Sequence, residues 1–228
     1  MAERDRDLID EQIDYYSRRA PEYDETSTPP GDPFGELHHP IEEALDDFGA
    51  AGKVLELACG TGTWTRLLVR HADELTALDA SADMLELARQ KVGDAPVRFL
   101  QADVFSWEPD QAYDVVAFAN WLSHVPSRRF EAFWSVVAAG LAPGGRVFFV
   151  DESKDAWRND EAWTEEWLDS ESTPLVRRTL RDGSTHRVIK VYWDPTELEA
   201  KLRSLGWDAH VHPVGPFMWA EARRTLTA

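Results

Sequence analysis

The sequence contains a single cysteine, Cys59, among its 228 residues. One cysteine cannot form an intrachain disulfide, so nothing in the chain requires an oxidising compartment. Long apolar runs are also missing, because the longest, residues 115–119 and 147–150, are far too short to cross a bilayer. Residues 1–14 are charged and contain no apolar stretch, unlike a signal peptide. These absences predict a cytoplasmic protein that does not enter a membrane.

Basic residues are scarce relative to acidic ones. The chain has 24 Lys and Arg against 42 Asp and Glu, which gives a formal net charge of −18 at pH 7. An acidic surface without a basic run repels polyanions, so we expect neither nucleic acid nor an anionic membrane as a partner. Hydrophobic residues make up 43% of the chain, as in a globular domain with a sizeable core. We expect a small-molecule substrate, and a monomer or a homodimer.

The middle of the chain alternates between apolar segments typical of strands and segments typical of helices. The expected strands are residues 53–58, 74–79, 97–102, 113–119 and 146–151, and the expected helices are residues 63–70, 82–91 and 128–139. This alternation is typical of a parallel sheet with crossover helices. Upstream, we expect a polar helix over residues 7–20, a proline-rich loop over 27–35 and a helix over 41–48.

The pattern changes after residue 151. Residues 152–172 are acidic and contain Trp157, Trp163 and Trp167, which a helix would partly bring to one face. Residues 175–182 and 185–193 predict a hairpin, and a helix over 197–204 and strands within 207–219 follow. We divide the chain into an N-terminal cap or lid, residues 1–40, and a main domain, residues 41–228, with residues 152–192 as a cap-like insertion.

A glycine-rich turn, Cys59-Gly60-Thr61-Gly62, joins the first strand of the main domain to the next helix. Gly60 and Gly62 let the backbone approach a ligand, and the N–H groups at a helix start favour a carboxylate or a phosphate. The alternative is a tight turn with no ligand. Asp79 ends the second strand, where a carboxylate can accept hydrogen bonds from ribose hydroxyls. Asp103 follows the third strand and can accept from an adenine amino group, although either aspartate can also be a helix or turn cap.

Four segments together resemble the successive motifs of class I S-adenosyl-L-methionine (SAM)-dependent methyltransferases that act on small molecules. They are Glu56-Leu-Ala-Cys-Gly-Thr-Gly-Thr63, Leu78-Asp-Ala-Ser-Ala-Asp-Met84, Gln101-Ala-Asp-Val104 and Leu141-Ala-Pro-Gly-Gly145, in the order and spacing of that family. The resemblance covers residues 15–151. It implies an α/β fold, a Rossmann-like doubly wound, seven-stranded and mostly parallel sheet, whose antiparallel last strand comes from residues 208–220, with a small N-terminal helical cap.

The resemblance also implies which residues bind SAM. Glu56 and the loop of Gly60 and Gly62 would hold the methionine part, and Asn120 would lie near it. Asp79 would hold the ribose, while Met84, Asp103 and Val104 would contact the adenine. The full set implied for the cofactor is Tyr16, Tyr23, Glu56, Ala58, Gly60, Gly62, Asp79, Ala80, Met84, Asp103, Val104 and Asn120. Met84 alone is equally consistent with the core, and the tyrosines with aromatic anchors of an ordinary helix.

Two side chains are candidates for catalysis, and no metal site is expected. His124 follows the fourth strand, and its ordinary pKa suits proton transfer near neutrality, although a structural role is the favoured interpretation. Tyr23, in the cap, is the second candidate, near the sulfonium. We expect His38 and His39 to face solvent. Cations of the expected hairpin, Arg177, Arg178, Arg187 and Lys190, could bind a carboxylate-bearing substrate, but a solvated strand face is preferred.

The expected activity is methyl transfer from SAM to an oxygen or nitrogen of a small, apolar or aromatic metabolite. Tyr192, Trp193, Phe217, Met218 and Trp219 suggest an aromatic pocket beside the cofactor. One alternative is a SAM-binding protein without turnover, since a fold does not prove an activity. Another is a nicotinamide-dependent oxidoreductase, against which Thr65 stands where that fingerprint needs Gly or Ala.

Overall fold

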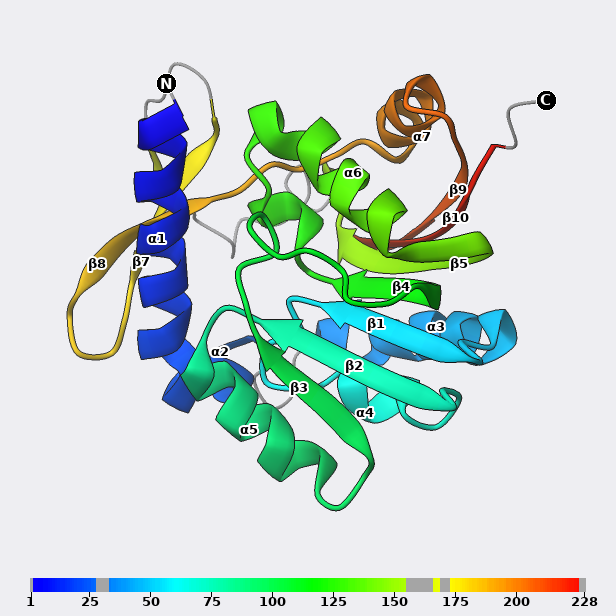
Figure 1. The fold of residues 1–228 in the computed structure, drawn as a ribbon. Coiled ribbons are helices and arrows are strands. Elements are labelled where there is room, and N and C mark those ends of the chain that lie inside the picture. Colours follow the sequence, from blue (N-terminus) through cyan, green and yellow to red (C-terminus); the bar gives the residue numbers. More distant parts are fainter. Residues whose placement is uncertain (1, 28–32, 155–165, 169–172, 226–228) are drawn as a thin grey trace.

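The computed structural model describes residues 2–27, 33–154, 166–168 and 173–225 (Figure 1). Within them, a seven-stranded sheet has the order β3-β2-β1-β4-β5-β10-β9, and β6-β7-β8 form a smaller sheet. The strands of the large sheet are β1 Lys53–Leu57, β2 Glu74–Asp79, β3 Val97–Gln101, β4 Tyr113–Ala119, β5 Leu141–Glu152, β9 Trp207–Val214 and β10 Phe217–Arg224. The first five are parallel, and β10 is antiparallel to both β5 and β9. The predicted fold class is confirmed.

Helices cover both faces of the large sheet (Figure 1). They are α1 Ala2–Arg19, α2 Tyr23–Ser27, α3 Pro33–Phe48, α4 Thr65–Leu68, α5 Ala82–Val92, α6 Phe130–Gly140 and α7 Pro195–Ser204. Three 3₁₀ turns, Ala20–Glu22, Leu122–His124 and Ser127–Arg129, connect some of them. No helix of the described residues is long and apolar enough to span a bilayer.

The core consists of two apolar layers, one on each face of the sheet. Successive side chains of a strand point to opposite faces, so Phe149 packs with Trp134 of α6 while Phe148 packs with Phe48 of α3. Both layers are dry, since the four aromatic side chains are at most 9% exposed. Because both faces of the sheet are covered, a ligand can reach the sheet at the carboxyl ends of its parallel strands.

Several predicted elements differ from the structure. Residues 33–35 belong to α3 instead of a loop, and this helix continues through Pro40, so the predicted boundary at residue 40 falls inside it. The expected helix over residues 63–70 is reduced to α4, residues 65–68. The turn at 142–145 is absorbed into β5, where the pairing with β4 shifts register between Tyr113 and Val115.

The small sheet contains β6 Glu166–Leu168, β7 Leu175–Thr179 and β8 Thr185–Ile189. The predicted hairpin of β7 and β8 is present, but Trp167 lies in a strand and not in a helix, and Trp157 and Trp163 lie outside the described residues. Helix α1 lies across this hairpin (Figure 1), with Ile9 buried among Leu175 and Ile189. The cap is therefore one packed unit built from two distant parts of the chain.

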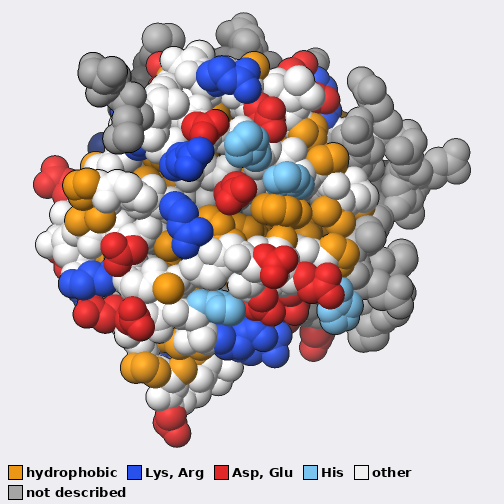
Figure 2. All heavy atoms as spheres, turned by 90° about the vertical axis from the view of Figure 1, so that its right-hand side faces the viewer, with side chains coloured by type: hydrophobic (Ala, Val, Ile, Leu, Met, Phe, Trp, Pro, Cys, Tyr) orange, Lys and Arg blue, Asp and Glu red, His pale blue; other side chains and the backbone are white. Residues whose placement is uncertain are grey.

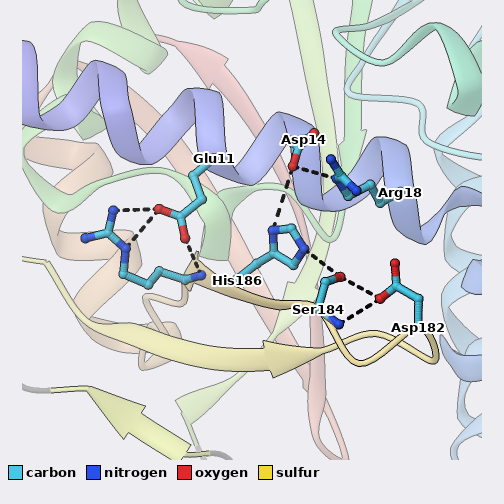
Figure 3. A network of polar contacts seen from close by, with 7 residues as sticks. Glu11, Asp14, Arg18, Asp182, Ser184 and His186 are labelled. Atoms are coloured by element: carbon cyan, nitrogen blue, oxygen red, sulfur yellow. Dashed lines mark hydrogen bonds and ion pairs between the residues drawn. The ribbon is translucent and has the colours of Figure 1, made fainter.

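Charged side chains also hold α1 to the hairpin (Figure 3). Both the backbone N–H and the guanidinium of Arg187 donate to the carboxylate of Glu11, at 2.7 and 2.9 Å. Asp14 accepts from Arg18 at 2.8 Å and lies 3.9 Å from His186. On the side of the molecule turned away from α1, acidic and basic side chains are interspersed without a continuous basic patch (Figure 2).

Candidate cofactor and acceptor site

A cavity of about 470 Å³ lies between the carboxyl ends of the parallel strands and the cap. In open α/β sheets this edge is where ligands bind. The predicted cofactor residues on its sheet side are Ala58, Gly60, Asp79, Ala80, Met84, Asp103, Val104 and Asn120, and those on its cap side are Tyr16 and Tyr23, with His124 beside them. The structure thus brings most of the predicted site together around one space.

The two glycines of the loop after β1 have different roles. A Cβ atom on Gly60 would meet nothing within 4 Å, and Gly60 lines the cavity at a φ of 54°. A Cβ atom on Gly62 would lie 2.9 Å from the backbone of Ala88 in α5, at a φ of 82°. Gly60 therefore keeps the cavity open to a ligand, whereas Gly62 permits close helix packing.

Asp79 organises this loop and faces the cavity. Its carboxylate accepts from the backbone N–H of Gly60 at 2.8 Å and from that of Ser81 at 2.9 Å. Burial raises the pKa of Asp79, and the hydrogen bonds from these N–H groups oppose the rise. Because each carboxylate oxygen has more than one acceptor position, Asp79 can still accept hydrogen bonds from two ribose hydroxyls.

Met84, Asp103 and Val104, which are predicted to contact the adenine, all line the cavity. Asp103 also accepts from the backbone N–H of Phe105 at 3.0 Å, so it caps a turn while it lines the cavity. Met84 is 1% exposed and lies in the first turn of α5, whose N-cap is Ser81. The structural interpretation of Met84 and Asp103 is therefore confirmed, and their contact with adenine stays a prediction.

Asn120 shows whether the residues present fit the expected cofactor. Its backbone is held at a φ of 51°, which is uncommon for a residue other than glycine and often marks a functional site. Its N–H donates to the carbonyl of Val150 at 2.8 Å, which fixes the residue at the end of β4. The side-chain Oδ1 is buried and has no hydrogen-bond partner among the described residues. A methionine ammonium group would supply that donor, so the residues present fit SAM.

Glu56 and Gly62 do not line this cavity. Glu56 is 2% exposed, and its carboxyl accepts a hydrogen bond of 2.5 Å from the hydroxyl of Thr65. Burial raises the pKa of Glu56 to about 8, a shift that the Thr65 hydrogen bond opposes and the neighbouring charge of Asp79 increases. Direct contact of Glu56 with the methionine part stays a prediction, and in this structure Glu56 supports the loop from behind.

His124 joins three elements at the cap end. Its Nδ1 lies 2.8 Å from the carbonyl of Ile189 in β8, and its Nε2 lies 2.8 Å from the hydroxyl of Tyr16 in α1. Gln12 of α1 donates to the backbone carbonyl of His124 at 3.3 Å and accepts from the N–H of Ile189 at 3.2 Å. Both ring nitrogens of His124 thus have protein partners, and both His124 and Tyr16 line the cavity.

The preference for a solvated hairpin face is wrong for two of its four cations. Arg178 and Lys190 line the cavity, and Lys190 is only 4% exposed, with its ammonium 3.1 Å from the carboxylate of Glu152. Arg177 and Arg187, which stand opposite each other in the hairpin, are exposed and pair with acidic residues. Because side chains alternate along a strand, neighbouring arginines of β7 belong to different surfaces.

Only some of the other residues predicted to line the pocket do so. Tyr192 and Phe217 line it, as expected. Met218 and Trp193 instead pack in the core, Trp219 stacks on Phe148, and Trp167 is 42% exposed. His38 lines the cavity with its ring 5.0 Å from that of Phe217, so the expectation that it faces solvent is wrong.

Cavity residues that the sequence analysis did not assign include Arg19, Trp64, Glu152 and Arg181. Trp64 directly follows the glycine-rich loop, and Arg19 follows the two tyrosines of α1, so their positions next to recognised motifs were a usable signal. Glu152 and Arg181 carried none, because their approach to the cavity depends on how the cap packs.

Comparisons with known proteins agree with this site. A family model described as a methyltransferase domain matches residues 54–145. The ubiquinone biosynthesis O-methyltransferase of Photorhabdus laumondii is 33% identical over 127 residues, which are 53% of this chain and 51% of that protein, so the chain spans about half the length of this relative. The solved structure of DhpI with SAM and HEP has a TM-score of 0.82 and 45% identity, over 95% of this chain and 97% of that one. DhpI with SAH gives a TM-score of 0.78 and 41% identity, over 96% and 98% of the two chains.

The chain belongs to the class I S-adenosylmethionine-dependent methyltransferases. The predicted family and cofactor are confirmed, and the oxidoreductase alternative falls away.

Proposed function

We propose that this protein transfers a methyl group from SAM to an oxygen atom of a small molecule that bears an acidic group. The observation that carries this proposal is the cationic wall of the cavity. Arg19, Arg178, Arg181 and Lys190 line its cap side together with the carboxylates of Glu22 and Glu152, while the other two carboxylates of the described lining, Asp79 and Asp103, lie on its sheet side. In a chain with a formal net charge of −18, such a local excess of cations favours an anionic ligand.

The cations of this wall differ in their partners. Lys190 is paired with Glu152 at 3.1 Å, and Arg181 with Glu22 at 3.1 Å and with Glu25 at 2.8 Å. The guanidinium of Arg19, by contrast, donates to the uncharged hydroxyl of Thr26 and lies 4.7 Å from the ring centre of Tyr23. The negative charge of a bound acid would therefore balance the positive charge of this wall. We accordingly propose an acidic substrate in place of the apolar or aromatic metabolite expected from the sequence.

Oxygen as the receiving atom is supported by the relatives. The curated relative from Photorhabdus is an O-methyltransferase, and HEP occupies the DhpI structure together with SAM. HEP is therefore the first acceptor to test with this protein.

SAM supplies an activated methyl group on its sulfonium, and the protein has to align an acceptor oxygen with it. Asp79 and Asp103 orient the nucleoside, and Asn120 orients the methionine part. Arg19 and Arg178 hold the acid so that its position relative to the cofactor is fixed. Tyr16 and Tyr23 close the cap side and exclude water.

The test is transfer of labelled methyl from SAM to a panel of small acids, including HEP, each paired with its neutral amide or ester. We expect transfer to at least one acid and none to its neutral partner. Arg178→Met should raise the KM for that acid at least tenfold, while Arg177→Met, which changes the adjacent exposed arginine, should leave it unchanged. Binding of SAH without transfer to any member of the panel would instead favour the alternative of a SAM-binding protein without turnover.

A further inference from the structure

Tyr16 and His124 form a hydrogen-bonded chain whose direction can be deduced. The carbonyl of Ile189 can only accept, so the Nδ1 atom of His124, 2.8 Å away, carries a hydrogen. In a neutral imidazole the other nitrogen, Nε2, then has a lone pair. The hydroxyl of Tyr16, 2.8 Å from Nε2, consequently donates its hydrogen to His124.

The surroundings keep both groups neutral in the resting protein. Burial lowers the pKa of His124 well below its ordinary value, and the charges of Lys190, Arg178 and Arg19 lower it further, against the hydrogen bond to Ile189. Burial likewise raises the pKa of Tyr16, so its phenol stays protonated. The charged or titratable groups that act on this pair come from α1, α2, β7 and the residue after β8, and they are Tyr15, Arg19, Tyr23, Arg178 and Lys190. Asp151 and Glu152, at the end of β5, face Lys190.

Because the hydrogen of Tyr16 points at His124, the phenol oxygen offers lone pairs to the cavity that it lines. A ligand group that meets Tyr16 must therefore donate a hydrogen bond. An acceptor hydroxyl meets this requirement, either an alcohol or the remaining hydroxyl of an acid that loses more than one proton. An oxygen without a proton does not.

We propose that Tyr16 and His124 relay a proton away from the acceptor oxygen during methyl transfer. The acceptor oxygen bonds to the methyl carbon while the carbon–sulfur bond breaks and its electron pair stays on sulfur. The acceptor proton passes to the oxygen of Tyr16, and the proton of Tyr16 passes to Nε2 of His124. The products are the methylated acceptor, SAH and an imidazolium that later loses its proton to solvent.

The negative charge of the bound acid makes His124 a better proton acceptor, so the relay depends on the substrate being bound. The cations that hold the acid, Arg19 and Arg178, are among those that disfavour a charged His124, together with Lys190. An anion placed between them offsets their field, so His124 becomes a stronger base when the substrate is in place. The relay rests on the proposed function, but the relay can be wrong while the proposed function is right. An acceptor oxygen that is already ionised could attack the methyl group directly and would need no base.

The variants Tyr16→Phe and His124→Gln test the relay in the intact chain. Glutamine can keep a hydrogen bond to Tyr16 and to Ile189 but cannot take up a proton. We expect each variant to lower the rate of methyl transfer in a single turnover about a hundredfold, within the usual contribution of general base catalysis, while the thermal unfolding midpoint stays close to wild type. For His124→Gln, the affinity for SAH should also stay close to wild type. The wild-type rate should fall at low pH, where His124 is protonated, and this acid limb should be absent in His124→Gln.

Matched controls lie outside the cavity. Tyr113→Phe removes a phenol that donates to Asp110, and His186→Gln changes a histidine of the α1–hairpin contact. Both should keep the wild-type rate and pH profile. A wild type that transfers methyl while His124→Gln matches it in rate and pH profile would overturn the relay and leave the proposed function standing.

A second measurement does not depend on turnover. Nitrogen-15 NMR of the histidine side chains should show His124 as the Nδ1–H tautomer at neutral pH, with its Nε2 signal shifted in Tyr16→Phe. An Nε2–H tautomer, or an imidazolium at pH 7, would overturn the direction of the hydrogen-bond chain on which the relay depends.

Discussion

Glu56 is a carboxyl group buried behind the glycine-rich loop, with a pKa of about 8. The folded protein therefore binds this proton more tightly than the unfolded chain, where a glutamate titrates near 4.5. The contribution of Glu56 to the free energy of unfolding is therefore complete below about pH 4.5 and is lost as the pH rises to about 8. At ~1.4 kcal/mol for each pKa unit, the full loss is on the order of 5 kcal/mol.

Glu56→Gln should remove this loss, because glutamine keeps an oxygen for the Thr65 hydroxyl and does not ionise. Urea unfolding at pH 5 and pH 8 is expected to give a smaller drop in stability for the variant than for wild type. Glu86→Gln, on the exposed face of α5, serves as the control and should follow wild type. Equal drops for wild type and Glu56→Gln would contradict the buried, protonated carboxyl.

The positions of residues at the cavity could be predicted where a side chain follows directly from a strand end. Asp79, Asp103 and Asn120 occupy the edge of the sheet that the parallel topology makes a ligand site, so their positions followed from the strand pattern. Arg178 and Lys190 could not be placed in the same way. Whether a hairpin side chain faces the cavity or solvent depends on which face of the hairpin α1 covers, and no local pattern encodes that.

At the scale of elements, the cap depends on apolar packing more than on its visible ion pairs. Ile9 of α1 is 4% exposed and packs with Leu175, Ile189 and Val191. The Glu11–Arg187 pair is partly exposed, and such pairs contribute about 1 kcal/mol or less. Removing a buried isoleucine side chain typically costs roughly 2–4 kcal/mol.

Ile9→Ala should therefore loosen the cap more than Arg187→Ala does. Limited proteolysis is expected to cut within α1 faster in Ile9→Ala than in wild type, while Arg187→Ala stays near wild type and the core of both variants keeps its secondary structure. Faster cleavage in Arg187→Ala than in Ile9→Ala would show that the charged contacts of Figure 3 dominate.

The sheet and most crossover helices were predictable because their patterns are local. Strands β1, β2 and β4 are continuous buried runs, as expected of parallel strands covered on both faces. The start of α3 was not predictable, because Pro40 suggests a break whereas the helix continues through it. The early start of β5 at Leu141 depends on pairing with Tyr113, a contact between distant parts of the chain.

At the scale of the whole molecule, a net charge of −18 opposes the approach of an acidic substrate. The long-range field is screened by salt over about 10 Å at 0.1 M, while the cations inside the cavity are screened much less. We predict that kcat/KM for an acidic acceptor rises between 20 and 150 mM NaCl. The KM for SAM itself should change less, and a falling kcat/KM would contradict a repelling surface field.

The central claim, that the cavity at the strand ends binds SAM, is tested most directly by isothermal titration with SAH. Wild type should bind SAH with micromolar affinity, and Asp79→Ala should weaken binding at least tenfold while the protein stays folded. Asp83→Ala, an exposed aspartate in the first turn of α5, should bind as wild type does. A folded wild type that does not bind SAH, or an Asp79→Ala variant that binds it equally well, would contradict the account of this site.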